Sequence, residues 1–164
     1  MRWFFFGSLM DIDICEVVIA KRLRDKDIQP ATLHGHVRVT VANETYPALK
    51  TQPGGAVAGI LVDHLNAEDA RRICFFEGEE FTLEPRTVEL ASGEHTEAMV
   101  FIAAAHLKIV ERPWDFAVWQ AIHKPHYLSL VHDWMAGYGA MDFMELDAQW
   151  VVNQTRMLQR RRTG

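Results

Sequence analysis

Glu77 is the residue of this sequence best suited to acid–base chemistry. It is expected at the end of a helix, where the negative helix terminus disfavours a carboxylate, and it directly follows Phe75 and Phe76. Apolar surroundings disfavour the charged form of a carboxyl group, so its pKa rises toward neutrality, where a general base or acid works. The alternative is a solvated glutamate in an acidic turn with Glu79 and Glu80.

A second candidate is the turn that begins at Gly7 and Ser8, between a short apolar run at 2–6 and a predicted helix. A glycine lets the backbone turn sharply, and the N–H groups of Gly7, Ser8 and Leu9 could converge on an anion. The segment lacks the lysine and glycine spacing of a phosphate-binding loop, and it lacks the second glycine of a nucleophile elbow. A plain strand-to-helix turn is the alternative interpretation.

The eight histidines raise the question of a metal site. His34 and His36 are expected on one face of a strand, and His123 and His126 lie three residues apart with Pro125 between them. No carboxylate or cysteine completes a recognisable ligand set. The sequence therefore predicts no metal site.

Composition limits the partners. The net charge is −5, and the basic residues are concentrated near the end of the chain at Arg156, Arg160, Arg161 and Arg162. Without these four, 13 basic residues face 22 acidic ones, so the rest of the chain carries about −9. Such a body repels nucleic acid, and we expect the arginines to form a solvated helix end.

The sequence also predicts where the protein resides. No apolar run approaches the roughly 18 residues of a membrane span, and the first residues do not resemble a signal peptide. Cys15 and Cys74 show no metal-ligand spacing and fall within apolar helical patterns, so we expect both to be reduced core residues. A cytoplasmic protein without membrane contact is expected.

Periodicity predicts an α+β protein, with most strands before most helices. Strands are expected at 2–6, 33–41, 57–62, 82–90 and 97–108, with a loop at 42–55 and a turn at 91–94. Helices are expected after a cap at Asp11 or Asp13, at 67–75, on both sides of Pro125 and, more weakly, at 143–158. Four tryptophans are expected to anchor the C-terminal helices: Trp114, Trp119, Trp134 and Trp150.

Three segments in this order resemble the γ-glutamylcyclotransferase-like, or AIG2-like, family. They are Phe5-Phe6-Gly7-Ser8-Leu9, Tyr46-Pro47-Ala48-Leu49 followed by Pro53-Gly54-Gly55, and Phe76-Glu77-Gly78 with Phe81. The resemblance covers residues 2–108. It implies a small mixed β-barrel flanked by helices. The length of the chain predicts a single domain over 1–164, and periodicity predicts a helical extension at 113–158.

The resemblance also implies an activity. A γ-glutamyl amino acid, peptide or amine would cyclise to 5-oxoproline and release the amine, with Glu77 as catalytic acid and base and with no metal or organic cofactor. The implied substrate-binding residues are Phe6, Gly7, Ser8, Leu9, Tyr46, Pro47, Ala48 and Phe81. We therefore expect Gly7, 47–49, Gly55 and Glu77 to line one cavity.

Two positions differ from the family, which usually has tyrosine where this chain has Phe6 and Phe81. The loss of two phenols mildly favours a non-catalytic module that binds an acidic metabolite in the same pocket, whereas Glu77 favours the enzyme. A third alternative is an interaction domain that uses the tryptophan-rich C-terminal part. A monomer or a homodimer is compatible with the sequence.

Overall fold

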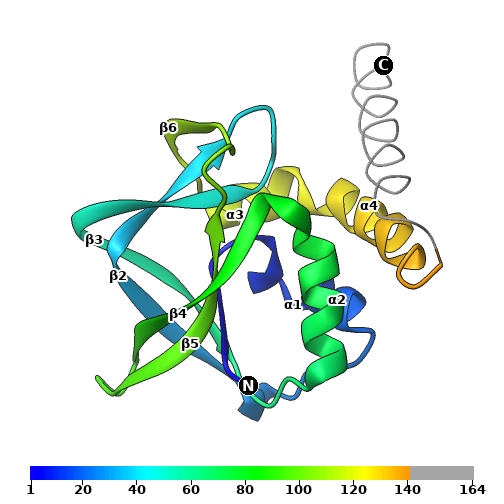
Figure 1. The fold of residues 1–164 in the computed structure, drawn as a ribbon, viewed down its shortest axis with the longest axis horizontal. Coiled ribbons are helices and arrows are strands. Elements are labelled where there is room, and N and C mark those ends of the chain that lie inside the picture. Colours follow the sequence, from blue (N-terminus) through cyan, green and yellow to red (C-terminus); the bar gives the residue numbers. More distant parts are fainter. Residues whose placement is uncertain (141–164) are drawn as a thin grey trace.

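The computed structural model describes residues 1–140, and its centre is a closed β-barrel (Figure 1). The barrel strands are β1 (Trp3–Phe5), β2 (Ile28–Val41), β3 (Pro47–Val62), β4 (Phe81–Leu90) and β5 (His95–Ala103). They pair in the order β3-β1-β5-β4-β2, and β2 pairs with β3 to close the ring. Only the β1–β5 pair is parallel among these neighbours, so the barrel is mixed. The expected α+β class and mixed β-barrel are confirmed.

Strand β1 separates two cores. All three of its residues are buried, and its side chains alternate between the two sides of the barrel wall. Trp3 and Phe5 join a core shared with the helices, whereas Phe4 and Phe6 join a core made only of barrel strands. Gly59 of β3 permits the close approach of β1, because a Cβ there would lie 2.3 Å from the Phe5 carbonyl oxygen.

The hairpin of β2 and β3 differs from the sequence prediction. Residues 42–55 are predicted to form a loop, but β3 begins at Pro47 and pairs with β2. The register shifts between His34 and His36, and a Cβ at Gly55 would be only 2.5 Å from the His36 carbonyl oxygen. The glycine serves the close approach of two strands rather than a loop, so the prediction is wrong from Pro47 onward.

Strand β5 is shorter than predicted. The sequence predicts one strand over 97–108, but β5 ends at Ala103, and the N–H of Ala104 then donates to the Glu80 carbonyl oxygen at 2.8 Å. A further strand, β6 (Ile109–Pro113), pairs with β2 and was not predicted. The connection between β5 and β6 contains His106, which lines the cavity described below.

Side-chain hydrogen bonds cap the N-terminal ends of the first two long helices. Asp11 accepts a hydrogen bond from the N–H of Ile14 at the start of α1 (Ile12–Ile19). Asn66 and Asp69 form a capping box at the start of α2 (Ala67–Glu77). Helix α2 extends beyond the predicted range 67–75 and ends at Glu77, so this carboxylate lies where the helix meets the barrel.

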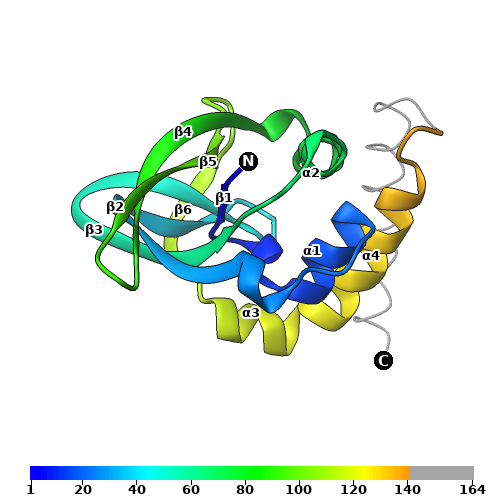
Figure 2. The ribbon, with the colours of Figure 1, turned by 90° about the horizontal axis from the view of Figure 1, so that it is seen from below.

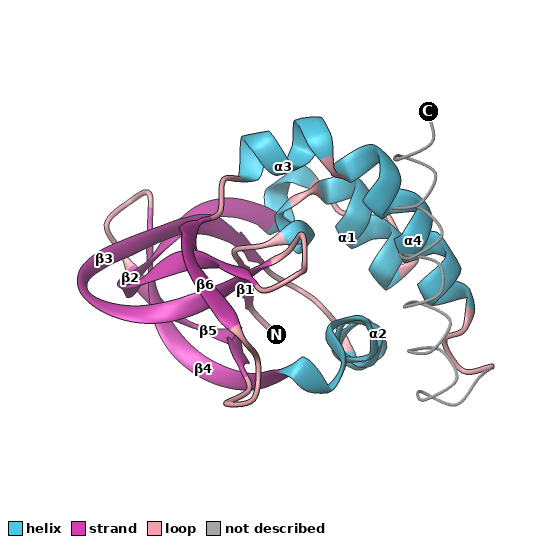
Figure 3. Ribbon diagram, turned by 90° about the horizontal axis from the view of Figure 1, so that it is seen from above, coloured by secondary structure: helices cyan, strands magenta, loops and turns pink. Residues whose placement is uncertain are grey.

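Two more helices complete the described part of the fold. They are α3 (Phe116–Ile122) and α4 (Lys124–Ala136), and Pro125 lies in the first turn of α4, as a helix start tolerates. The Lys124 ammonium pairs with Asp11 and Asp13 at 2.9 and 2.6 Å, which ties the start of α4 to the start of α1. Helices α1, α2 and α4 gather on one side of the barrel (Figures 2 and 3).

The remaining predictions have mixed outcomes. Trp114, Trp119 and Trp134 are buried as expected. Cys15 is buried in α1, but Cys74 is exposed on α2, so the prediction of two core cysteines is wrong for Cys74. The reason is helical geometry, because the buried side of α2 carries the adjacent residue Ile73.

Some predictions lie outside the described residues. These are the last helix at 143–158, Trp150 and the arginines at 156–162. Over residues 1–140, we find no helix with the length and apolar character needed to cross a membrane.

Candidate active site

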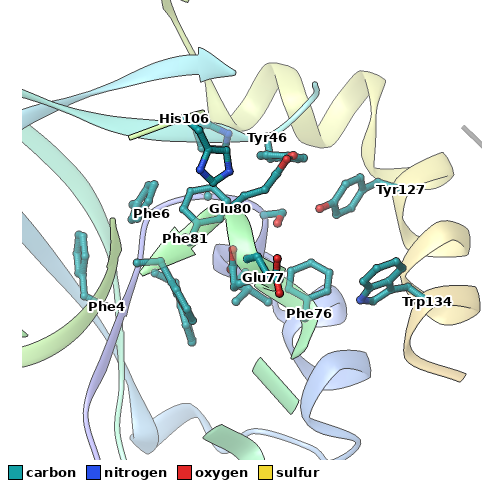
Figure 4. Close-up of a pocket in the computed structure, with 18 residues that line it drawn as sticks. Phe4, Phe6, Tyr46, Phe76, Glu77, Glu80, Phe81, His106, Tyr127 and Trp134 are labelled. Carbon is teal, nitrogen blue, oxygen red and sulfur yellow. The ribbon is translucent and has the colours of Figure 1, made fainter. Parts of the chain in front are cut away.

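A cavity of about 280 Å³ lies where the end of β1, the junction between α2 and β4, and helix α4 meet (Figure 4). Its walls combine aromatic side chains with backbone and carboxylate groups. They are formed by residues 4–9, Tyr46 and Pro47, residues 76–81, Phe101, His106, Tyr127 and Trp134.

One wall is the turn formed by Gly7, Ser8 and Leu9, called the 7–9 turn below. The N–H of Met10 donates to the Gly7 carbonyl oxygen at 3.0 Å, so the N–H groups of the 7–9 turn precede the first hydrogen bond of this helical turn. The Pro47 ring, which also lines the cavity, packs against Gly7, where a Cβ would lie 3.1 Å from the proline Cδ. The turn therefore presents backbone to the cavity with a glycine where space is limited.

Glu77 faces the same cavity from the end of α2. The helix stops there because Gly78 adopts a positive φ of 66°, and the chain then turns into β4. Burial raises the pKa of Glu77 to about 8, and the negative charge of Glu80 adds to the effect. Near neutrality this carboxyl group is therefore divided between its protonated and ionised forms, as a group that both accepts and returns a proton requires.

Tyr46 lines the same cavity as the end of this helix. Its hydroxyl donates a hydrogen bond of 2.5 Å to Glu80, and its ring contacts Phe81 edge-on with a centroid distance of 6.2 Å. Burial and the bond to Glu80 raise the pKa of Tyr46, so the phenol stays protonated and keeps donating. Figure 4 shows Tyr46 and Glu80 directed toward one another near His106.

Tyr127 brings helix α4 to the site. Burial raises the pKa of this phenol, a hydrogen bond with the Ser8 side chain acts in the opposite direction, and the charge of Glu77 raises it further. Tyr127 thus lies within electrostatic reach of the 7–9 turn and of the carboxylate. Trp134, two turns later on α4, covers the same side of the cavity (Figure 4).

The charge of the lining is one-sided. Glu77, Glu79 and Glu80 line the cavity, whereas no lysine or arginine of the described chain does so. An anionic group could therefore be held mainly by backbone N–H groups. Within residues 1–140, no group of three histidine, cysteine, aspartate or glutamate side chains could hold a metal ion.

The cavity brings together most of the site residues that the sequence predicted. Those that line it are Phe6, Gly7, Ser8, Leu9, Tyr46, Pro47, Glu77 and Phe81. Ala48, Leu49 and Gly55 do not line it, and their prediction as cavity residues is wrong. Successive residues of a strand point to opposite sides, so Ala48, which is fully buried in β3, points away when Pro47 faces the cavity.

Sequence reasoning missed three features of the wall. His106 lies in a connection that was predicted to be strand, and Tyr127 and Trp134 were assigned to a helix core. A buried tyrosine needs a partner for its hydroxyl, and this need was the only signal that Tyr127 has a polar neighbour.

Comparison with known proteins supports the resemblance seen in the sequence. The family described as "Gamma-glutamyl cyclotransferase, AIG2-like" matches residues 3–121. Protein AIG2 C of Arabidopsis thaliana is 23% identical over 130 residues, which cover 76% of this chain and 75% of that protein.

Two solution structures of Arabidopsis thaliana proteins share the fold. One has a TM-score of 0.59 at 20% identity and covers 78% of this chain and 85% of its own. The other has a TM-score of 0.59 at 18% identity and covers 84% and 82%. Because the family match spans most of the chain and includes both the 7–9 turn and Glu77, this protein belongs to the γ-glutamyl cyclotransferase, AIG2-like family.

Proposed function

We propose that the protein is an enzyme that converts a γ-glutamyl amino acid, peptide or amine into 5-oxoproline and the free amine. The observation that carries the proposal is the position of Glu77. This carboxyl group, with a pKa of about 8, shares one cavity with the 7–9 turn, although the two are far apart in the sequence. An ionisable group tuned to neutrality beside free backbone donors is a typical arrangement for acid–base catalysis.

In the proposed reaction the α-amine of the γ-glutamyl group attacks its own γ-carbonyl carbon. The new C–N bond closes a five-membered lactam, and the C–N bond to the departing amine breaks. Glu77 takes a proton from the α-ammonium group, so that the nitrogen can attack, and returns this proton to the departing nitrogen. The second proton that the attacking nitrogen loses as the lactam forms passes to the released amine, which leaves as an ammonium ion. The reaction is intramolecular, so a cavity that holds the γ-glutamyl chain folded back contributes much of the rate enhancement.

The other cavity residues have binding roles in this proposal. The N–H groups of the 7–9 turn hold negative charge on the substrate, since no lysine or arginine of the described chain lines the cavity. Phe6 and Phe81 enclose the carbon chain, with Tyr46 and Pro47 beside them. Ala48 has no role, because it does not line the cavity.

The direct test is a screen of γ-glutamyl compounds, with release of 5-oxoproline measured by chromatography. The library includes γ-glutamyl amino acids, dipeptides and simple amines. We expect turnover of at least one class, and Glu77→Gln should reduce that turnover by at least about 10²-fold. If calorimetry detects binding of these compounds and none of them is turned over, the protein is instead a binding module for an acidic metabolite.

A further inference from the structure

Arg38 contacts the site from outside the cavity. It lies on β2, and its Nη1 donates to the carbonyl oxygen of Phe6 at 3.0 Å and contacts the sulfur of Met10 at 3.3 Å. Phe6 immediately precedes the 7–9 turn and Met10 immediately follows it. One guanidinium group therefore holds both ends of the segment that presents N–H groups to the cavity.

The positive charge of Arg38 is partly removed from water. The side chain is half-buried and lies over the Trp114 ring, 5.5 Å from its centroid. Burial lowers the pKa of Arg38 and the charge of Asp115 raises it, and an arginine stays protonated in either case. Among the ion pairs of residues 1–140 none includes Arg38, so its charge is not cancelled by direct contact with a carboxylate.

Arg38 acts on the Gly7 N–H through the peptide bond between Phe6 and Gly7. The peptide bond between Phe6 and Gly7 is trans, so its N–H lies on the side opposite its carbonyl oxygen. Because Arg38 binds the carbonyl oxygen, the Gly7 N–H points away from the arginine. A cation bound to the carbonyl also polarises the amide, which makes its N–H a stronger donor to an anion.

An anionic ligand in this cavity would gain from positive charge that lies outside the lining. Three glutamates line it, and no lysine or arginine of the described chain reaches it. We propose that Arg38 is a positioning residue that orients and polarises the 7–9 turn, so that the turn binds the carboxylate of the ligand. The identity of the ligand, a γ-glutamyl compound or its product, rests on the proposed function.

A matched pair of ligands isolates this role. 5-Oxoproline carries a carboxylate, whereas 5-oxoprolinamide has nearly the same shape without the charge. We expect Arg38→Met to weaken 5-oxoproline binding by roughly ten- to a hundredfold, as loss of hydrogen bonding to a charged group does, and to change amide binding by less than about twofold. Arg38→Lys keeps the charge but not the planar fork, so it should recover part of the affinity.

Arg72 provides the control. Its Nε donates to the Val18 carbonyl oxygen at 2.6 Å and its guanidinium lies over the Tyr138 ring, 4.7 Å from the centroid, so its contacts are of the same kind. Arg72 does not line the cavity, and Arg72→Met should leave both affinities unchanged. Calorimetry on each variant, with thermal unfolding to verify the fold, completes the comparison.

The outcomes separate this inference from the proposed function. Equal losses for acid and amide in Arg38→Met, an unchanged affinity for the acid, or a wild type that does not bind the acid would each overturn the role of Arg38. If Arg38→Met selectively weakens 5-oxoproline binding but the wild type releases no 5-oxoproline from γ-glutamyl compounds, the role of Arg38 is retained and the proposed enzyme is refuted. If the wild type turns over γ-glutamyl compounds but Arg38→Met leaves 5-oxoproline binding unchanged, the proposed enzyme is retained and the role of Arg38 is refuted.

Discussion

The Tyr46 hydroxyl and the Glu80 carboxylate form a hydrogen bond of 2.5 Å across the cavity wall, between segments 34 residues apart. The charge of Glu80 is the second cause, after burial, of the raised pKa of Glu77. Tyr46 thus holds in place the carboxylate whose charge acts on Glu77. Separate substitutions of Tyr46 and Glu80 distinguish the effect of the hydrogen bond from the effect of the charge.

Glu80→Gln should lower the pKa of Glu77, because it removes a negative charge and keeps an oxygen that can accept from Tyr46. The pH at which kcat/KM reaches half its plateau should move below that of the wild type, which is expected near 8. The shift should be the smaller part of the total, since burial is the larger cause. Measurement of kcat/KM from pH 5 to 10 tests this, and an unchanged midpoint would contradict it.

Tyr46→Phe is the complementary change, because it keeps the charge of Glu80 and removes the hydrogen bond. The midpoint of the pH profile should stay at the wild-type value. Stability should fall by about 1.5–3 kcal/mol, the range for a hydrogen bond to a charged group. Urea unfolding gives this value, and a variant as stable as the wild type would show that the bond contributes nothing.

Glu77 should make the free energy of unfolding depend on pH. Its pKa is about 8 in the folded protein against 4.5 for the free group, so between these values the folded state binds a proton that the unfolded state has released. Stability should therefore fall as the pH rises through this window, by up to a few kcal/mol. Glu77→Gln removes the ionisable group, and urea unfolding of both proteins at pH 5, 7 and 9 should show a difference that decreases with acidity.

For catalysis, Glu77→Gln should reduce 5-oxoproline release by at least about 10²-fold, the lower limit for general acid–base catalysis. The glutamine keeps the shape of the side chain and loses only its basicity. Ligand affinity should change by less than about tenfold, because binding relies on the 7–9 turn and the cavity walls. Near wild-type turnover in this variant would remove Glu77 from the mechanism.

Local chemistry explains which parts of the site the sequence predicted. The surroundings of Glu77 follow from its own neighbours, two phenylalanines before it and a glycine after it, so the raised pKa could be anticipated. The apolar run before Gly7 likewise identifies a buried strand followed by a turn. Each of these features depends on a few consecutive residues, and each is found in the structure.

The failures depend on long-range pairing. Residues from Pro47 to Gly55 have loop-forming composition, and they become strand because β2 lies beside them. Tyr127 has the spacing of an ordinary helix core residue, and only the docking of α4 places it beside Ser8. Arg38 alternates with valines on a strand, and no local pattern reveals that it binds the Phe6 carbonyl.

Gly59→Ala should destabilise the barrel. A Cβ at this position would lie 2.3 Å from the Phe5 carbonyl oxygen and 2.6 Å from the Phe4 ring, so β1 and β3 would have to move apart. Overpacking of this kind costs roughly 1–3 kcal/mol, and backbone contact puts this site at the upper end. Thermal and urea unfolding would measure the loss, and wild-type stability would show that β1 is free to shift.

Tyr127 and Ser8 should contribute to catalysis through one shared interaction. Tyr127→Phe removes the hydroxyl that links α4 to the 7–9 turn, and Ser8→Ala removes its partner. Each change should lower kcat/KM for 5-oxoproline release, and the double variant should be little worse than either single one, since both break the same interaction. The coupling energy expected from such a cycle is about 1 kcal/mol. Additive losses would show that the two side chains act separately, and α4 would then only cover the cavity.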